Sequence, residues 1–275
     1  MRVWVLGCRG STPAPGPATV RYGGNTSALA LAMDDGPPTL LLDAGTGLVN
    51  LQDVLGGEAF RGALLLSHLH WDHTHGLPFS PATDHDDAAV DLRLPAQRVP
   101  AHEALARAMS PPHFPIGPDG LRGAWSFRGL EEGRVEAGGF EVLAREIPHK
   151  GGRTFGYRVV APDGRSLAYL PDHQPTALGT GPHGFGPVHE AARALADGVD
   201  LLVHDAQYTL EEFPTSQHFG HSAIDYAVAL AAVAEAGRLL AFHHAPTRPD
   251  DELDELAARF ASTVTFAREG DHLSV

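Results

Sequence analysis

Three histidines and one aspartate stand close together in the stretch Ser67-His68-Leu69-His70-Trp71-Asp72-His73. Residues 63–66, directly before it, are apolar and follow a glycine, which predicts a buried strand. Because buried polar groups need partners, ligand-type side chains at the end of such a strand indicate a bound metal ion. Neutral imidazole and carboxylate suit zinc, and they also suit iron or manganese. The alternative is a histidine-rich loop that faces solvent.

The spacing of these ligands predicts two metal positions. In an extended segment His68 and His70 point to the same side, because they are two residues apart. Asp72 and His73 come after the turn and aim at a second point. Asp43, at the end of an earlier apolar run, either orients a ligating histidine or caps the helix that follows.

Composition and length predict one folded domain that spans residues 1–275. Of these residues, 43% are hydrophobic and 20% are charged, as in globular proteins. No apolar run reaches the roughly eighteen residues of a membrane span, and the first residues do not form a signal peptide. The single cysteine, Cys8, excludes an intrachain disulfide, and we expect a cytoplasmic location.

The net charge of −14 restricts the class of substrate. A chain this acidic repels polyanions, and its sequence contains no segment rich in Lys and Arg. Duplex nucleic acid is therefore not expected as a partner. A small anionic substrate is expected instead, drawn to the metal ions. The sequence does not choose between a monomer and a homodimer.

Strands and helices alternate along the chain. Strands are predicted over 2–6, 27–33, 39–43, 63–67, 125–127, 134–136, 140–147, 155–160, 166–170, 200–203, 238–242 and 264–267. Helices are predicted over 48–55, 102–109, 188–196, 223–236 and 251–260. The Pro-rich segment 78–118 is expected to be irregular apart from its short helix, as an insertion or lid over the site.

Further candidate site residues follow the ends of predicted strands. They are His149, Asp172, Asp205 and His243. This order of elements predicts an α/β protein with two sheets packed face to face, helices outside, and the site along one rim of the sheets. No internal repeat divides the chain.

The combination of the 67–73 motif with His149, Asp172 and His243, each in this order, resembles the metallo-β-lactamase superfamily. The resemblance covers nearly the whole chain. It implies a four-layer αββα sandwich of two mixed sheets that carries one or two metal ions. It assigns His68, His70 and His149 to the first ion, and Asp72, His73 and His243 to the second. Asp172 matches the carboxylate that bridges both ions, and Asp72 is counted among the catalytic residues as well.

Two shorter stretches resemble phosphodiesterases of this superfamily. Val203-His204-Asp205-Ala206 and Gly220-His221-Ser222 are similar to motifs of the tRNA 3′-processing endonucleases, in which a carboxylate and a histidine protonate the leaving group. The resemblance implies that His221 is the general acid and that Asp205 orients it. Asp205 is one methylene shorter than the glutamate of those enzymes, and capping of the next helix is the alternative for His221.

The opening Gly7-x-Arg9-Gly10-Ser11, together with residues 22–27, is similar to proteins related to the phosphoribosyl cyclic-phosphate phosphodiesterases. The long arm with which the tRNA enzymes grip RNA has no counterpart in segment 78–118, which favours a small substrate. Four cationic residues either hold a phosphate or are plain surface charges: Arg9, Arg21, Lys150 and Arg153.

Together these features predict a dinuclear metal-dependent hydrolase. The expected reaction is cleavage of a small phosphodiester, cyclic or open, by a hydroxide that bridges two divalent ions. Zinc is favoured, with manganese and iron as the alternatives. The alternative activities are a nuclease that acts on short single strands and a glyoxalase-like hydrolase of thioesters or lactones. A metal-storing protein without catalytic activity is the non-enzymatic alternative.

Overall fold

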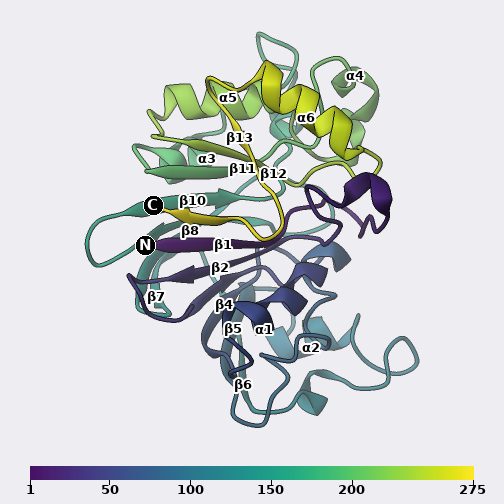
Figure 1. Cartoon of the computed structure of the whole chain (residues 1–275), viewed down its shortest axis with the longest axis vertical. Coiled ribbons are helices and arrows are strands. Elements are labelled where there is room, and N and C mark those ends of the chain that lie inside the picture. Colours follow the sequence, from purple (N-terminus) through teal and green to yellow (C-terminus); the bar gives the residue numbers. More distant parts are fainter.

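The computed structural model describes residues 1–275 and contains two seven-stranded mixed sheets (Figure 1). The first sheet has the order β14-β1-β2-β3-β4-β5-β6 and the second the order β13-β12-β11-β10-β9-β8-β7. The strands of the first sheet are β1 (Arg2–Gly7), β2 (Ala28–Ala32), β3 (Leu40–Leu42), β4 (Arg61–Leu65), β5 (Ala89–Pro95), β6 (Ala124–Leu130) and β14 (His272–Ser274). Those of the second are β7 (Gly133–Ala137), β8 (Phe140–Glu146), β9 (Phe155–Val160), β10 (Ser166–Leu170), β11 (Leu201–Asp205), β12 (Leu239–Phe242) and β13 (Thr265–Phe266).

The two sheets follow the same plan. In the first, β1 to β3 are antiparallel and β3 to β6 are parallel. In the second, β7 to β10 are antiparallel and β10 to β13 are parallel. Neighbouring parallel strands end at the same edge of a sheet, so the residues that follow them are brought together there. This is why side chains far apart in sequence can form one site.

Helices cover the outer face of each sheet (Figure 1). The α-helices are α1 (Leu51–Val54), α2 (Ala101–Ala106), α3 (Glu190–Ala196), α4 (Phe213–Ser216), α5 (Ile224–Val233) and α6 (Asp250–Arg259). Helix α6 begins with three acidic residues, which interact favourably with the positive end of the helix dipole. None of these helices combines the length and apolar character needed to cross a membrane.

Three apolar clusters separate the four layers. Alternation along β2 shows how one strand contributes to two of them. Leu29 and Leu31 face the cluster between the sheets, while Ala28 and Ala30 face the cluster under the helices of the first sheet. A third cluster lies under α3, α5 and α6. The central strands β2 and β3 consist only of apolar residues, as expected for strands that are buried on both faces.

The predicted αββα class is confirmed, and most of the predicted elements are present within a few residues of their expected bounds. The interpretation of segment 78–118 as irregular apart from its helix was wrong, because residues Ala89–Pro95 form β5 in the interior of the first sheet. Val90, Leu92 and Leu94 enter the core, whereas Asp91 and Arg93 pair with each other on the other face. The flanking prolines concealed this alternation. The short elements β14 and α4 were also not predicted.

Candidate metal centre and active site

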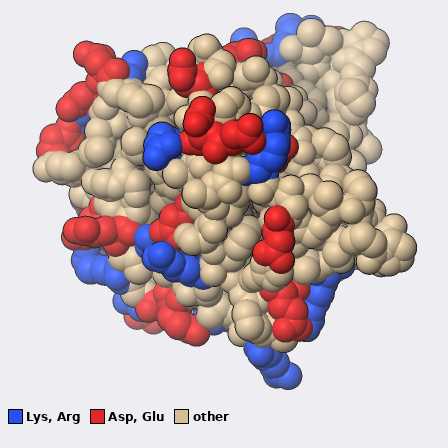
Figure 2. All heavy atoms as spheres, turned by 90° about the horizontal axis from the view of Figure 1, so that it is seen from below, with Lys and Arg blue, Asp and Glu red and all other residues tan.

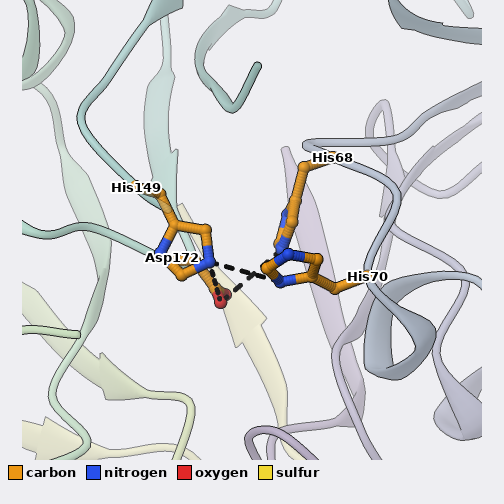
Figure 3. Close-up of side chains that lie close together, drawn as sticks. All are labelled: His68, His70, His149 and Asp172. Carbon is orange, nitrogen blue, oxygen red and sulfur yellow. Dashed lines mark hydrogen bonds and ion pairs between the residues drawn. The ribbon is translucent and has the colours of Figure 1, made fainter. Parts of the chain in front are cut away.

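The first group of ligand-type side chains consists of His68, His70, His149 and Asp172, whose ligand atoms all lie within 4.8 Å of one another. His68 and His70 lie in the loop after β4, His149 follows β8, and Asp172 follows β10. Figure 3 shows the three imidazoles turned toward the carboxylate of Asp172. Asp172 Oδ2 lies 3.7 Å from His68 Nε2 and 3.5 Å from His149 Nε2. His149 Nε2 lies 3.3 Å from His70 Nδ1.

The second group consists of Asp72, His73, Asp172 and His243, all buried. Asp172 presents its other oxygen to this group: Oδ1 lies 3.0 Å from His73 Nε2 and 3.1 Å from His243 Nε2. His243 Nε2 is also 3.1 Å from Asp72 Oδ2. The carboxylate of Asp172 therefore stands between two clusters, with one oxygen toward each. The structure brings together all seven residues that the sequence predicted as ligands.

Unpartnered polar atoms show that the chemistry of these residues fits bound cations. His68 Nε2, His73 Nε2 and Asp172 Oδ1 are buried without a hydrogen-bond partner, which is costly unless an ion binds them. Burial and the neighbouring His73 hold the pKa of His68 well below its usual value, so His68 is neutral, the form that binds metals. Although burial lowers the pKa of His73, Asp172 and Asp72 raise it overall. The carboxylates of Asp72 and Asp172 thus place negative charge beside the imidazoles, and bound cations would neutralise this charge.

Backbone strain accompanies two residues of the centre. Asp43 follows β3 with φ 61°, and His243 follows β12 with φ 60°. A left-handed conformation costs a residue other than glycine about 1–3 kcal/mol and persists where the surroundings enforce it, often at functional sites. The turn at His243 also separates it from the adjacent His244, whose Nε2 donates to the carbonyl of Ala267, away from the centre.

Asp43 orients a candidate ligand, which is the first of the two roles that the sequence left open. Its Oδ2 accepts hydrogen bonds from His73 Nδ1 (2.7 Å), Ser67 Oγ (2.8 Å) and Tyr169 Oη (2.9 Å). With Nδ1 held in this way, His73 turns Nε2 toward Asp172. The helical turn after Asp43 has Gly45 at its N-cap and no side-chain cap.

Gln207 is the corresponding residue for His243, and sequence reasoning missed it. Gln207 Oε1 lies 2.9 Å from His243 Nδ1, so it accepts the Nδ1 hydrogen and leaves Nε2 for a metal ion. A single glutamine shortly after Asp205 belongs to no motif that spacing could identify. Its neighbour Tyr208 was missed as well: its hydroxyl accepts from Gln207 Nε2 at 3.2 Å, and burial raises its pKa to about 12.

We expect Gln207→Ala to weaken metal binding about 10–100-fold, because loss of a partner that orients a ligand has this effect in metal sites. Competition against a chromophoric chelator measures the affinity. Gln52→Ala is the matched control, because Gln52 is exposed on α1 and should leave the affinity unchanged. Equal affinities in the two variants would show that Gln207 does not position His243.

His221 and Asp205 form a buried pair beside the first group. His221 Nδ1 lies 3.1 Å from Asp205 Oδ2, so the shorter aspartate does reach the histidine. The same oxygen accepts the backbone N–H groups of His173 and Ser222 at 3.1 and 3.2 Å, which fixes its position. Burial lowers the pKa of His221, but Asp205 raises it overall. Capping by His221 is not observed, because Ala223 is the N-cap of α5.

The candidate ligands open into a cavity of about 760 Å³. His70, Asp72, His149, Asp172 and His221 all line it, together with Ser11, Lys150, Tyr208 and Phe219. The backbone N–H of Ser11 donates to Asp72 Oδ2 at 2.7 Å and so holds this carboxylate in place. The cavity has room for a small organic phosphate beside the two groups.

Of the four cationic residues, only Lys150 lines this cavity, and its Nζ donates to the carbonyl of His218 at 2.7 Å. Arg21 pairs with Asp251 and Asp254. Arg153 pairs with Glu131 and Glu146. Arg21 and Arg153 are therefore engaged elsewhere on the protein.

Both interpretations of Arg9 were wrong, because its side chain is fully buried and structural. Its Nε donates to the carbonyl of Gly23 at 2.7 Å, and Nη1 donates to that of Arg248 at 2.8 Å. Nη2 pairs with the buried Asp250 at 3.3 Å. Arg9 thus ties the first loop to the segment that follows His243.

We expect Arg9→Leu to lower the free energy of unfolding of the metal-free protein by about 3 kcal/mol, because it leaves the carboxylate of Asp250 buried without its ion pair. Urea denaturation measures this change. Arg61→Leu, at an exposed position, should stay within about 0.5 kcal/mol of the parent. A loss of similar size in both variants would contradict the structural role of Arg9.

Comparisons with known proteins concern the whole chain and its fold. The chain is 25% identical to a ribonuclease Z of Bradyrhizobium sp. (strain ORS 278), over 89% of this chain and 93% of that protein. The solved structure of a diphosphatase from the PhnP family has a TM-score of 0.69 and 19% identity, over 100% of this chain and 97% of that one. Zn(2+)-bound PqqB from Methylobacterium extorquens has a TM-score of 0.70 and 19% identity, over 100% of both chains. These two likenesses show the shared fold.

A match to a family model shows to which superfamily the chain belongs. The model of the β-lactamase superfamily domain matches residues 39–244, more than half of the chain. The matched range begins just before β3 and ends just after His243, so it includes every residue of the two groups. The chain therefore belongs to the metallo-β-lactamase superfamily.

Proposed function

We propose that this protein is a metal-dependent phosphodiesterase that cleaves a small phosphodiester. The observation that carries the proposal is the position of Asp172, with one carboxylate oxygen toward each of two buried groups of imidazole and carboxylate ligands. A ribonuclease acts on phosphodiesters, and relatives that are named ribonuclease Z support the same class of bond for this chain.

Two divalent ions would be held by His68, His70 and His149 on one side of Asp172, and by Asp72, His73 and His243 on the other. When bound, such ions supply a nucleophile from water at neutral pH and stabilise the charge that develops on the phosphoryl oxygens. Zinc is the favoured ion, because the site is rich in histidine and because a neighbour of this fold was solved with zinc bound.

The remaining steps belong to side chains of this chain. His221 donates a proton to the oxygen of the departing alcohol, which would otherwise leave as an alkoxide. Asp205 accepts the Nδ1 hydrogen of His221, which lines the cavity, so Nε2 is the ring nitrogen left to donate a proton to the substrate. Hydrolysis of a thioester has a good leaving group and needs no such acid, so the pair favours phosphodiesters over a glyoxalase-like reaction.

The charge of the protein favours a small substrate over a long nucleic acid. The net charge is −14, and on the face seen in Figure 2 acidic groups lie among the few basic ones without a continuous basic patch. A nuclease that acts on short single strands is the second candidate, and the similarity to ribonuclease Z favours it.

A hydrolysis panel on metal-reconstituted protein tests the proposal. It comprises a chromogenic phosphodiester, a cyclic ribose phosphate, a cyclic nucleotide, a short single-stranded oligonucleotide and a glutathione thioester. We expect turnover of the small phosphodiesters and none of the thioester. Preference for the oligonucleotide would favour the nuclease, and turnover of the thioester alone would overturn the proposal. A metal-loaded protein that is inactive on every substrate would indicate metal storage.

A further inference from the structure

A second cavity, of about 270 Å³, adjoins the metal centre and has no part in the chemistry above. One wall is formed by residues 69–79, which begin within the loop after β4 that carries His68 and His70 (the ligand loop). The opposite wall is formed by residues 104–114, at the end of α2 and just after it. Leu69 lines this cavity as well as the larger one that contains the candidate ligands. Since Leu69 stands between His68 and His70, the second cavity begins directly beside the metal site.

The chemistry of this second cavity differs from that of the metal centre. No Lys, Arg, Asp or Glu side chain lines it, and most of its lining residues are apolar, including Leu77, Leu105, Met109 and Phe114. The hydroxyl of Thr74 already donates to the carbonyl of His70 at 3.0 Å. The other polar side chains of the lining are the exposed imidazoles of His75 and His113. A charged group would lose its hydration among the apolar residues without a buried ionised partner, so the cavity favours an uncharged apolar group.

Exposed aromatic rings mark the approach to this cavity. Trp71 is 66% exposed and lines the larger cavity, which contains the candidate ligands. Its ring stacks on that of His75, which lines the second cavity, and the two ring centroids are 5.5 Å apart. Phe79 is 62% exposed and packs edge-on against Phe114 at 5.6 Å. Large apolar side chains exposed in one region indicate a surface that a ligand covers.

We propose that this cavity binds one arm of the substrate, an uncharged apolar group of aromatic size, while the phosphate lies at the metal centre. The inference rests on the proposed function and specifies its substrate as a phosphodiester in which one of the two alcohols is bulky and apolar. An apolar cavity of about 150 Å³ binds benzene, so the present cavity accommodates a larger group such as a fused pair of rings.

Calorimetric titration of the metal-loaded protein with two phosphate monoesters tests the proposal. Methyl phosphate and 2-naphthylmethyl phosphate carry the same phosphate and differ only in the arm. We expect the naphthylmethyl ester to bind at least about tenfold more tightly, because its arm fills an apolar pocket. Equal dissociation constants in the parent protein would overturn the proposal.

Variants of lining residues test whether the second cavity is where the naphthylmethyl arm binds. Ala108 is an exposed residue that lines the cavity, so Ala108→Phe fills the cavity and should bring the ratio of the two dissociation constants close to one. Phe79→Ala, which removes an exposed ring at the rim, should lower the ratio as well. Ala232→Phe, at an exposed position on α5, is the matched control and should keep the parent ratio. A preference that persists in Ala108→Phe would place the arm elsewhere.

The titration also separates this inference from the proposed function. If the naphthylmethyl ester binds more tightly than methyl phosphate but no phosphodiester of the panel is hydrolysed, the proposed function is wrong and the apolar binding site is supported. If phosphodiesters are hydrolysed but the naphthylmethyl arm gives no preference, the proposed function stands and the apolar site fails.

Discussion

Asp172→Asn is expected to remove the bound metal ions and to lower phosphodiesterase activity by about 10⁴-fold or more. Asparagine keeps the shape of the side chain but removes the charge that lies between the two groups of ligands. The imidazoles on both sides would then face an uncharged amide, and neither ion would retain its shared carboxylate. Because each factor of ten corresponds to about 1.4 kcal/mol, the expected loss is close to 5.5 kcal/mol of transition-state stabilisation.

Elemental analysis of the dialysed protein, together with the rate on a chromogenic phosphodiester, checks this result. Asp87→Asn is the matched control, because it removes one exposed carboxylate that does not line the cavity and should keep both metal content and rate. An Asp172→Asn protein with full metal content and near-parent turnover would exclude a bridging role for this residue.

His221→Ala is expected to keep the metal ions and to slow turnover by about 10²–10⁴-fold on substrates with poor leaving groups. An alkoxide needs a proton as it departs, and His221 is held by Asp205 at the edge of the cavity to donate one. A nitrophenolate departs without protonation, so nitrophenyl esters should be hydrolysed at nearly the parent rate.

The dependence of rate on the leaving group distinguishes an acid from a merely structural residue. We expect the rates of His221→Ala to fall steeply as the pKa of the departing alcohol rises, and those of the parent to fall only slightly. If His221→Ala slowed every substrate by the same factor, the residue would have a structural role. If it matched the parent on alkyl esters, the assignment of a general acid would be wrong.

The ligand set could be predicted from the sequence because its members stand at the ends of apolar runs. Asp172 and His243 follow β10 and β12, which lie on either side of β11 in a parallel part of the sheet, so their convergence follows from topology. Asp205, the last residue of β11, arrives at the same edge for the same reason. The 67–73 motif supplied His68, His70, Asp72 and His73, and the resemblance to the metallo-β-lactamase superfamily identified His149, which follows the antiparallel strand β8.

Other parts of the site depend on packing that no local pattern encodes. Arg9 belongs to a glycine-rich loop that looks exposed in sequence, yet the segment after His243 folds over it and buries it. Gln207 becomes a partner of His243 only because β11 and β12 are neighbours. The second cavity exists because α2 and the residues after it pack against the ligand loop, and the prolines of segment 78–118 conceal β5, which leads to that helix.

Anomalous diffraction at the zinc absorption edge, from crystals of the zinc-loaded protein, shows directly whether Asp172 lies between two bound ions. We expect two anomalous peaks, one among His68, His70 and His149 and the other among Asp72, His73 and His243, with Asp172 between them. A single peak away from Asp172, or no peak within either group in protein that binds zinc in solution, would contradict this arrangement.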